Sequence, residues 1–195
     1  QTSHNVMKKI LSFILLGATS LVASAQISSL DELSTDKAYT IYNPFYTTYA
    51  VYNAEKSTSL VWAAGMTASD KTIADQSYTT PFNAADPSSS WMIVPFNDQW
   101  LVYNLAAKKF MAVGHTAANS STASAKLQDT PVAVEFTSNG NGGFHLRSYD
   151  GNQNFLCAAP QLSYPISIWT SADNGSTWKI EENAQVQADY ETCLK

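Results

Sequence analysis

The chain has 195 residues, of which 14% are charged, and its formal net charge is −5. This length suits a single domain, and the acidic balance leaves no basic patch for phosphates or for anionic lipid headgroups. Nucleic acid and anionic membranes are therefore not expected as partners. The many Ser, Thr, Asn, Gln and Tyr residues are typical of an exported all-β protein.

The N-terminus has the pattern of a secretory signal. A short basic start precedes an apolar run at 10–23, which is too short to be a comfortable membrane span and closes on a small-x-small pattern. We predict that residues 1–6 are upstream read-through, that 7–25 are a signal peptide, and that cleavage falls between Ala25 and Gln26. The expected product is secreted, periplasmic or displayed at the cell surface, and does not stay inserted in a membrane.

The rest of the chain repeats one arrangement of strands three times. Two aromatic-led strands lie ten or eleven residues apart around a short polar connection, and a related strand closes each unit. The paired strands are expected at 39–43 with 49–53, at 100–104 with 110–114, and at 144–148 with 155–159. The closing strands are expected at 91–93, 134–136 and 178–180.

Three units of about 40 residues, each too small to bury its own apolar face, would share one core. We therefore predict an all-β chain folded as a β-trefoil with threefold pseudosymmetry over residues 37–182, whose closure removes exposed strand edges. A two-sheet sandwich is the alternative, because strands resemble one another in any all-β chain. Residues 26–36 are expected to be a linker, and 66–90 an insertion that lengthens the first unit.

The C-terminal residues differ in character from the repeats. Residues 183–195 are polar, lack turn residues, and could begin a helix at Asn183. They are expected to be a tail, which is either the end of the protein or the start of a truncated further segment. No disulfide is expected, because Cys157 reads as a small buried residue of a strand while Cys193 lies in this tail.

The stretch SADNGSTW at 171–178 fits a pattern called the Asp box, which is best known from sialidases. The pattern is first a turn, in which the Asp accepts hydrogen bonds from backbone N–H groups and the Trp anchors in the core. Proteins that resemble sialidases hold the substrate carboxylate with three arginines, whose forked guanidinium matches it. This chain has one arginine, Arg147, so sialidase activity is not expected.

Residues 155–180 resemble a repeat of the R-type (ricin-B-like) lectins. The Ile-Trp pair at 168–169 matches the apolar-Trp pair of those lectins, and Ser-Thr-Trp at 176–178 stands where they have Q-x-W. The resemblance implies a β-trefoil and carbohydrate binding. It also implies altered sugar pockets, because Ala158 or Ala159 stands where the family has a hydroxyl-binding Asp, and a serine replaces the Gln.

The function expected from these observations is an exported, non-catalytic, lectin-like module that binds a glycan or glycoprotein and could serve a larger secreted hydrolase. Sugar binding favours an exposed ring beside amide or carboxylate side chains. The turn at 149–154 presents such a group, and the first connection offers Phe45 and Tyr46 likewise. The candidate ligand-binding residues are Tyr149, Asp150, Asn152, Asn154, Trp169, Asn53, Glu55 and Tyr46.

Catalytic and metal-binding constellations are not expected. His115 lies in a Ser/Ala-rich loop and His145 in a strand, neither with a nucleophile motif or a ligand at metal-binding spacing. No cofactor is expected, and Glu181 and Glu182 read as a solvated strand end. The alternative function is a protein-binding or inhibitor-type β-trefoil that uses the long 66–90 loop for recognition. A third is a domain that only docks or spaces a catalytic neighbour.

Overall fold

The computed structural model describes residues 24–65, 80–114, 124–148, 154–158 and 165–194, and within them twelve strands form one continuous sheet. The first unit contains β1 (Tyr39–Asn43), β2 (Thr48–Asn53), β3 (Ser57–Ala64) and β4 (Trp91–Phe96). The second contains β5 (Gln99–Asn104), β6 (Lys109–Ala112), β7 (Lys126–Gln128) and β8 (Val134–Ser138). The third contains β9 (Phe144–Ser148), β10 (Phe155–Cys157), β11 (Ser167–Trp169) and β12 (Lys179–Glu182). The described helices are η1 (Leu30–Glu32), η3 (Pro87–Ser89), η4 (Asn174–Ser176) and α1 (Tyr190–Leu194).

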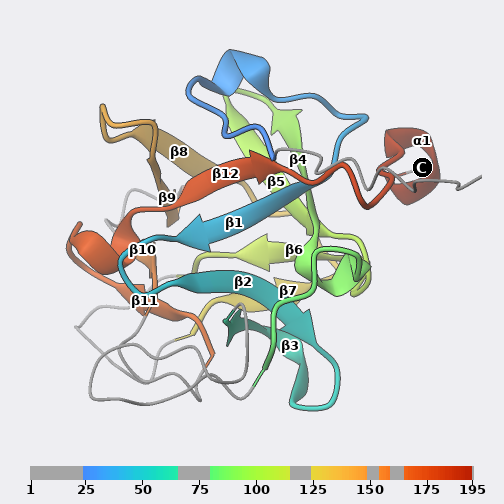
Figure 1. Ribbon diagram of the computed structural model, residues 1–195, viewed down its shortest axis with the longest axis horizontal. Helices are drawn as coiled ribbons and strands as arrows, with labels where there is room; N and C mark the ends of the chain where they lie inside the picture. Colours follow the sequence, from blue (N-terminus) through green and yellow to red (C-terminus); the bar gives the residue numbers. More distant parts are fainter. Residues whose placement is uncertain (1–23, 66–79, 115–123, 149–153, 159–164, 195) are drawn as a thin grey trace, which may run out of the picture.

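The first and last strands of the units close into a ring. The antiparallel order is β1, β4, β5, β8, β9 and β12, and β12 pairs with β1 again. Between β9 and β12 the backbones of Phe144 and Trp178 exchange two hydrogen bonds of 2.7 and 2.8 Å. Figure 1 shows the outcome, with β12 beside β1 although they lie at opposite ends of the fold's sequence. This closed ring excludes the two-sheet sandwich.

The second and third strands of each unit form hairpins that meet at one end of the ring. The amide of Val61 donates to the carbonyl of Ala125, that of Ala125 to Ile166, and that of Ile166 back to Val61, at 3.0, 2.9 and 2.8 Å. One residue from each unit therefore takes part in a cycle of three equivalent bonds. This cycle marks the pseudo-threefold axis of the β-trefoil predicted from the repeat.

Three of these hairpin strands, β3, β7 and β11, were not expected from the sequence. β3 begins with three polar residues, and β7 and β11 are only three residues long, so none shows the alternation that identified the other strands. Their partners lie partly in other units, because Leu60 pairs with Lys126. The expected strands at 110–114 and 155–159 end earlier than predicted, at Ala112 and Cys157.

The core inside the ring contains the two tryptophans that the sequence assigned to it. Trp91 and Trp178 are both fully buried, and each indole N–H donates a 2.8 Å hydrogen bond to a carbonyl of the second strand of its own unit, that of Ala50 or of Leu156. The second unit has the buried Val134 at the matching place. Pseudosymmetry therefore extends to side-chain hydrogen bonds in two of the three units.

The expectation of a linker at 26–36 is wrong. The amide of Ile27 donates to the carbonyl of Ile180 at 2.8 Å, and the Ile27 side chain is buried in the core. Leu30 and Leu33, in and after η1, also pack against the core, and η1 lies above β1 and β12 in Figure 1. The apolar residues of this polar segment are spaced irregularly, so only the packed structure reveals what they contact.

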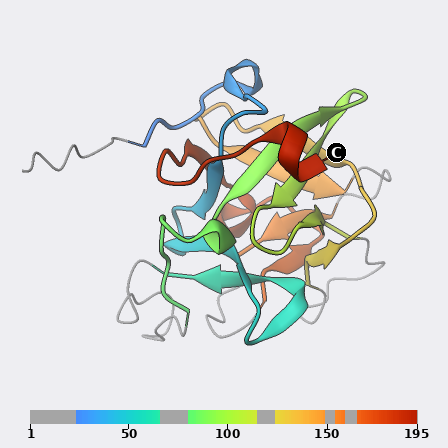
Figure 2. The same cartoon turned by 90° about the vertical axis from the view of Figure 1, so that its right-hand side faces the viewer.

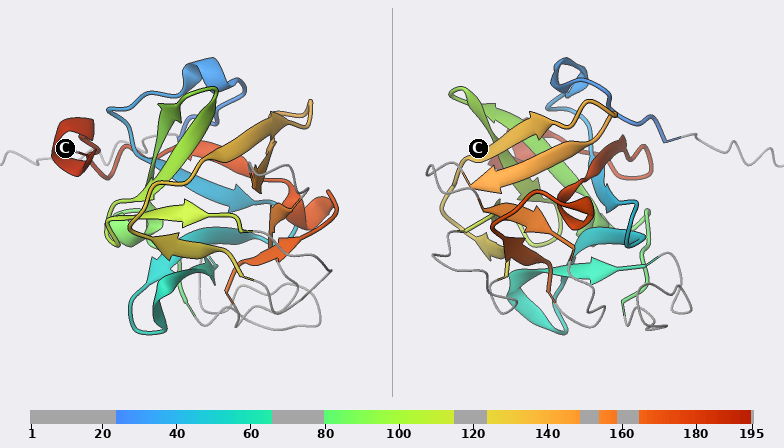
Figure 3. Two further views of the ribbon diagram at one scale, coloured as in Figure 1. Left: turned by 180° about the vertical axis from the view of Figure 1, so that it is seen from behind. Right: turned by 90° about the vertical axis from the view of Figure 1, so that its left-hand side faces the viewer.

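The C-terminal segment is also packed against the domain, and its helix does not begin at Asn183. The segment at 183–189 is non-helical, and α1 starts at Tyr190. Figure 2 shows α1 lying across the outer face of β4 and β5, where Cys193 and Leu194 pack against a second cluster that includes Met92. Figure 3 shows the β4–β5 and β8–β9 hairpins side by side around the remainder of the ring.

The two cysteines are free thiols with different surroundings. Cys157 is buried, and burial raises the pKa of its thiol to about 12, whereas Cys193 is half-exposed in α1. Because the thiolate is the nucleophile, Cys157 should be inert in the folded protein. We expect iodoacetamide at pH 8 to alkylate Cys193 and spare Cys157 until a denaturant is added, as read by mass spectrometry. Alkylation of Cys157 in the native protein would contradict its burial.

Candidate ligand-binding site

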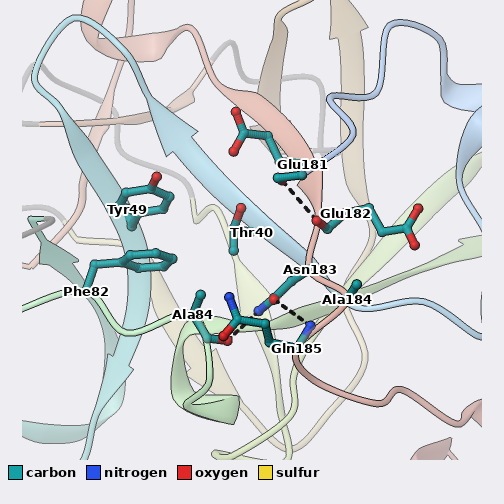
Figure 4. Close-up of a pocket in the computed structure, with 10 residues that line it drawn as sticks. Thr40, Tyr49, Phe82, Ala84, Glu181, Glu182, Asn183, Ala184 and Gln185 are labelled. Carbon is teal, nitrogen blue, oxygen red and sulfur yellow. Dashed lines mark hydrogen bonds between the residues drawn. The ribbon is translucent and has the colours of Figure 1, made fainter. Parts of the chain in front are cut away.

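A pocket of about 100 Å³ lies on the outer face of the ring, where β1, β2 and β12 meet the end of the 66–90 insertion. Side chains alternate along a strand, so the buried Tyr39 and Ile41 of β1 point into the core while Thr40 between them points outward. Figure 4 shows Thr40 in the middle of the pocket. Two aromatic rings lie on one side of it, and β12 with the segment after it lies on the other.

The aromatic side of the pocket is made by Tyr49 of β2 and Phe82 of the insertion. Their rings stack with centroids 3.6 Å apart and planes 12° apart, and Tyr42 contacts Tyr49 at 4.6 Å between centroids. Phe82 is held in place because the amide of Gly65 donates to Thr80 and the amide of Phe82 donates back to Gly65. One end of the insertion is thereby ordered against β2.

The polar side of the pocket comes from β12 and the residues after it. Glu182 forms a 2.7 Å ion pair with Lys37, and its hydrogen bond raises the pKa of that lysine. In Figure 4 the Glu181 carboxylate points away from that of Glu182, and it forms no ion pair with any residue of the described ranges. These glutamates are therefore part of a pocket rather than only a solvated strand end. Gln185 contributes an amide to the same rim.

The rim is fixed by Asn183, which is buried. Its Nδ2 donates to the Ala84 carbonyl at 2.7 Å and to Ser90 Oγ at 2.8 Å, while its Oδ1 accepts from the Gln185 amide at 3.1 Å. Figure 4 shows the bond to Ala84, which joins the C-terminal side of the pocket to the insertion side, and the bond from Gln185, which lies within the C-terminal segment. Opposite walls that are distant in sequence are thus held together by one side chain.

The residues just before the expected cleavage point also reach the pocket. Ser24 lines it and donates from Oγ to the Glu182 carbonyl at 3.0 Å, and the Ala25 carbonyl accepts from the Glu182 amide at 2.9 Å. These two residues add a short extended segment to the free edge of β12. They cover backbone groups of the rim that would otherwise be open.

The 171–178 segment forms η4 and leads into the start of β12 at Lys179, at the other end of that strand from the pocket. Asp173 caps η4 and accepts from the Ser176 amide at 3.1 Å. Asn43, at the end of β1, donates from Nδ2 to the carbonyls of Asn174, Gly175 and Thr177, each at 2.9 Å. The segment is therefore a structural turn, exposed at 171–174 and buried at Gly175, Ser176 and Trp178, that sets the position of β12 against β1.

The same construction occurs in the first unit, which the sequence comparison of units did not reveal. Asp86 caps η3 ahead of Trp91, and Asn104 at the end of β5 donates to the carbonyls of Ser88 and Ser90 at 3.0 and 3.4 Å. In both units an Asp-capped turn leads into a buried Trp. The signal that could have identified it is the shared D-x-x-S-x-W spacing of 86–91 and 173–178.

Three of the predicted site residues, Tyr149, Asp150 and Asn152, lie outside the described residues. Asn154 is 1% exposed, and its Nδ2 is one of the buried side-chain atoms without a hydrogen-bond partner. Trp169 is half-buried in β11, opposite Phe155 of β10. Asn154 thus faces the interior, whereas Trp169 is partly open to solvent.

The other predicted site residues serve local structure. Asn53 accepts from the amides of Glu55 and Lys56 and donates to Thr80 Oγ1, so it closes the β2–β3 turn. Glu55 is exposed at that turn. Tyr46 packs against the core, and burial raises the pKa of its hydroxyl. The structure does not bring these residues together with Asn154 and Trp169 into one site.

The residues that do form the pocket were not singled out by the sequence. Tyr49 was taken only as the first residue of a strand, Glu181 as a strand end, and Phe82 as part of the insertion. Only Phe82 carries a local signal, because a large aromatic residue in a polar, Pro-containing segment needs a packing partner. Thr40 and Gln185 have no such signal, because their neighbours come from distant segments.

The described residues contain no group of three or more His, Cys, Asp and Glu placed to hold a metal ion. In the ranges that the structure describes, no helix is long and apolar enough to cross a membrane. Burial and the nearby Arg147 lower the pKa of His145, and its Nε2 lies 3.5 Å from the Thr177 hydroxyl. His145 is therefore a neutral, partly buried residue of β9 at pH 7.

No family model and no curated protein matches this chain. Among solved structures, the Macrolepiota procera ricin B-like lectin in complex with lactose matches at 13% identity with a TM-score of 0.58, over 76% of this chain and 97% of that one. The designed threefold-symmetric protein ThreeFoil matches at 13% identity with a TM-score of 0.55, over 74% and 97%. The Rhizoctonia solani agglutinin matches at 15% identity with a TM-score of 0.53, over 75% and 95%. The chain therefore has the β-trefoil fold seen in ricin B-like lectins.

Proposed function

We propose that this chain is an exported, non-catalytic carbohydrate-binding module and that the pocket beside Tyr49 and Phe82 is its sugar site. The observation that carries the proposal is an aromatic pair that shares a small pocket of a β-trefoil with Glu181, whose carboxylate forms no ion pair with a described residue. A ring face packs against the C–H groups of a sugar, and a carboxylate accepts hydrogen bonds from two hydroxyls. The lactose complex of the Macrolepiota procera lectin supports this choice of ligand class.

A catalytic role is not proposed for this pocket. Glycosidases place two carboxyl groups on opposite sides of the scissile bond. Here Glu181 and Glu182 are neighbours on one strand, their carboxylates point apart in Figure 4, and Glu182 is occupied by Lys37. The two groups cannot flank one bond in this arrangement. A hydrolase, if one is associated, would lie in another domain that this module serves.

Export would enlarge the proposed sugar site. Cleavage after Ala25, which the sequence predicts, removes both residues that cover the edge of β12. The amide and the carbonyl of Glu182 would then be free to donate to and accept from a ligand at the pocket rim. The mature protein is thus expected to bind more tightly than a form that begins at Ser24, which a titration of the two forms would show.

The proposal is tested by binding of the purified chain to a broad glycan array, followed by calorimetric titration of the best neutral glycan. We expect Phe82→Ala and Glu181→Gln each to weaken binding by about tenfold or more, because each removes one side of the pocket. Phe96→Ala is the matched control, since Phe96 is an exposed phenylalanine on the β4–β5 turn. Equal binding by all three variants would overturn the placement of the site.

The alternative, recognition of a protein through the 66–90 loop, has one observation in its favour. The described end of the insertion is tied to the barrel by the Phe82 ring and by the backbone bonds of Gly65 with Thr80 and Phe82, so the loop is anchored on a rigid scaffold. Residues 66–79 lie outside the described part. A folded protein that binds no glycan, but is retained by one defined protein in the presence of competing sugars, would favour this alternative.

A further inference from the structure

A second hollow opens at the other end of β12, and no part of the proposed function uses it. Its volume is about 430 Å³, and its lining includes Pro44 and Phe45 of the β1–β2 turn, Asn139 and Asn141 of the β8–β9 turn, and Asn174 and Lys179 around the start of β12. Three turns from different units therefore meet around one depression. An exposed ring, three amides and one cation surround it.

Phe45 is presented to solvent on a braced turn. Its side chain is 55% exposed, the highest fraction among the large hydrophobic residues of the described part that are exposed. The ring rests edge-on against Tyr46 with centroids 4.9 Å apart, and Tyr46 in turn lies against Gly175, where an added Cβ would come within 3.0 Å of its ring. The half-buried Tyr46 therefore holds an apolar face outward at a fixed place.

The polar groups of the hollow keep free hydrogen-bonding capacity. Asn139 accepts with Oδ1 from the amides of Asn141 and Gly143 at 3.0 and 3.1 Å, which orients its Nδ2 as an available donor. The side-chain amides of Asn141 and Asn174 form no hydrogen bond with described residues. Lys179 is only half-buried and forms no ion pair in the described part of the chain. The hollow thus holds one positive charge that has no ion-pair partner among the described residues.

The hollow and the pocket of Figure 4 lie on the same face of one pair of strands. Lys179 and Glu181 lie on either side of the buried Ile180 in β12, so both point outward and their Cα atoms are about 7 Å apart. On β1 their partners are Tyr42 and Thr40, and Tyr42 contacts the pocket ring Tyr49. A ligand could therefore run from the Phe82 end to the Phe45 end across Tyr42 without leaving this face.

We propose that the hollow is a second subsite, which takes a carboxylate-bearing sugar of the same glycan whose neighbouring neutral residue occupies the pocket. This proposal rests on the proposed function. Lys179 pairs with the sugar carboxylate, Phe45 packs against a ring face, and the asparagines bind the remaining hydroxyls. The carboxylate lies at the Phe45 end, because Glu181 at the other end repels it. The chain thus distinguishes acidic from neutral glycans by one cation.

The test compares calorimetric titrations of the purified chain with three probes, namely sialyllactose, a trisaccharide that ends in a hexuronate, and neutral lactose. We expect the two acidic probes to bind about tenfold more tightly than lactose, and Lys179→Met to remove this preference while leaving lactose binding unchanged. The preference should also fall with rising salt. Comparison of the two acidic probes shows which source of carboxylate the hollow accepts.

The matched control is Lys126→Met, which removes the same charge from an exposed lysine of β7 that lines neither depression. Phe45→Ala should weaken all acidic probes but not lactose. Equal affinity for acidic and neutral probes in a chain that still loses lactose binding on Phe82→Ala would overturn the second subsite alone. Absence of binding to any probe, in a chain shown to be folded by circular dichroism, would overturn the proposed function as well.

Discussion

Replacing Trp178 by alanine is expected to lower the free energy of unfolding by about 4 kcal/mol. The side chain is fully buried, its indole N–H donates to the Leu156 carbonyl, and its backbone closes the ring through two hydrogen bonds to Phe144. The substitution leaves a cavity at the junction of β9 and β12, where the ring is held by a single pair of residues. Urea denaturation followed by circular dichroism measures the change.

Trp178→Phe is the control that separates packing from hydrogen bonding. It keeps most of the apolar volume but leaves the Leu156 carbonyl without its donor, so a loss of about 1–3 kcal/mol is expected. Trp91→Ala should resemble Trp178→Ala, since Trp91 has the same burial and the same bond to Ala50. A loss below about 2 kcal/mol for both alanine variants would show that the core relaxes around them.

Asn43→Asp is expected to destabilise the protein by about 3–5 kcal/mol at pH 7. The amide of Asn43 donates to three carbonyls, each at 2.9 Å, and its Oδ1 accepts from the Tyr46 amide. An aspartate at this fully buried position would direct a charged oxygen at those carbonyls. The introduced carboxyl would therefore stay protonated in the folded state, so its pKa would lie above the unfolded value of about 3.9.

Because the folded-state pKa of the introduced carboxyl lies above its unfolded value, the stability of the variant depends on pH. Above about pH 4 the unfolded chain loses the proton that the folded chain retains, so the stability of Asn43→Asp should fall as the pH rises. The difference from the wild type should be smallest near pH 4 and largest at neutral pH. Asn53→Asp is the matched control, because Asn53 lies half-exposed at a turn and its Nδ2 donates only to the Thr80 hydroxyl, which can itself donate to a carboxylate. A loss of stability on Asn43→Asp that does not change with pH would contradict the placement of this side chain against three carbonyls.

The strands predicted correctly are those whose side chains alternate within the strand itself. β1 and β9 have the predicted bounds, and the closing strands near Trp91, Val134 and Trp178 lie where they were expected. In β9, for example, the buried Phe144 and Leu146 alternate with the half-buried His145 and Arg147. The periodicity is local, so it can be read without knowing the partner strand.

The sequence did not point to the residues of the candidate pocket, because they come from different units. The sequence favoured turn residues with neighbouring amides, such as Tyr46 and Asn53, but these groups are used by the turns themselves. Phe45, named alongside Tyr46, is the residue that the turn leaves exposed. The pocket joins Tyr49, Phe82 and Glu181, which become neighbours only when β12 closes the ring beside β1.

The amino-acid sequence by itself determined the class of fold and the burial of Trp91 and Trp178. The threefold spacing of aromatic-led strands requires three small units to share one core, since none can bury its apolar face alone. Only the tertiary structure decided which strands β3 and β7 pair with, that the segment at 26–36 packs into the domain, and which side chains share the outer face of β1 and β12. These depend on ring closure between distant residues, which no local pattern encodes.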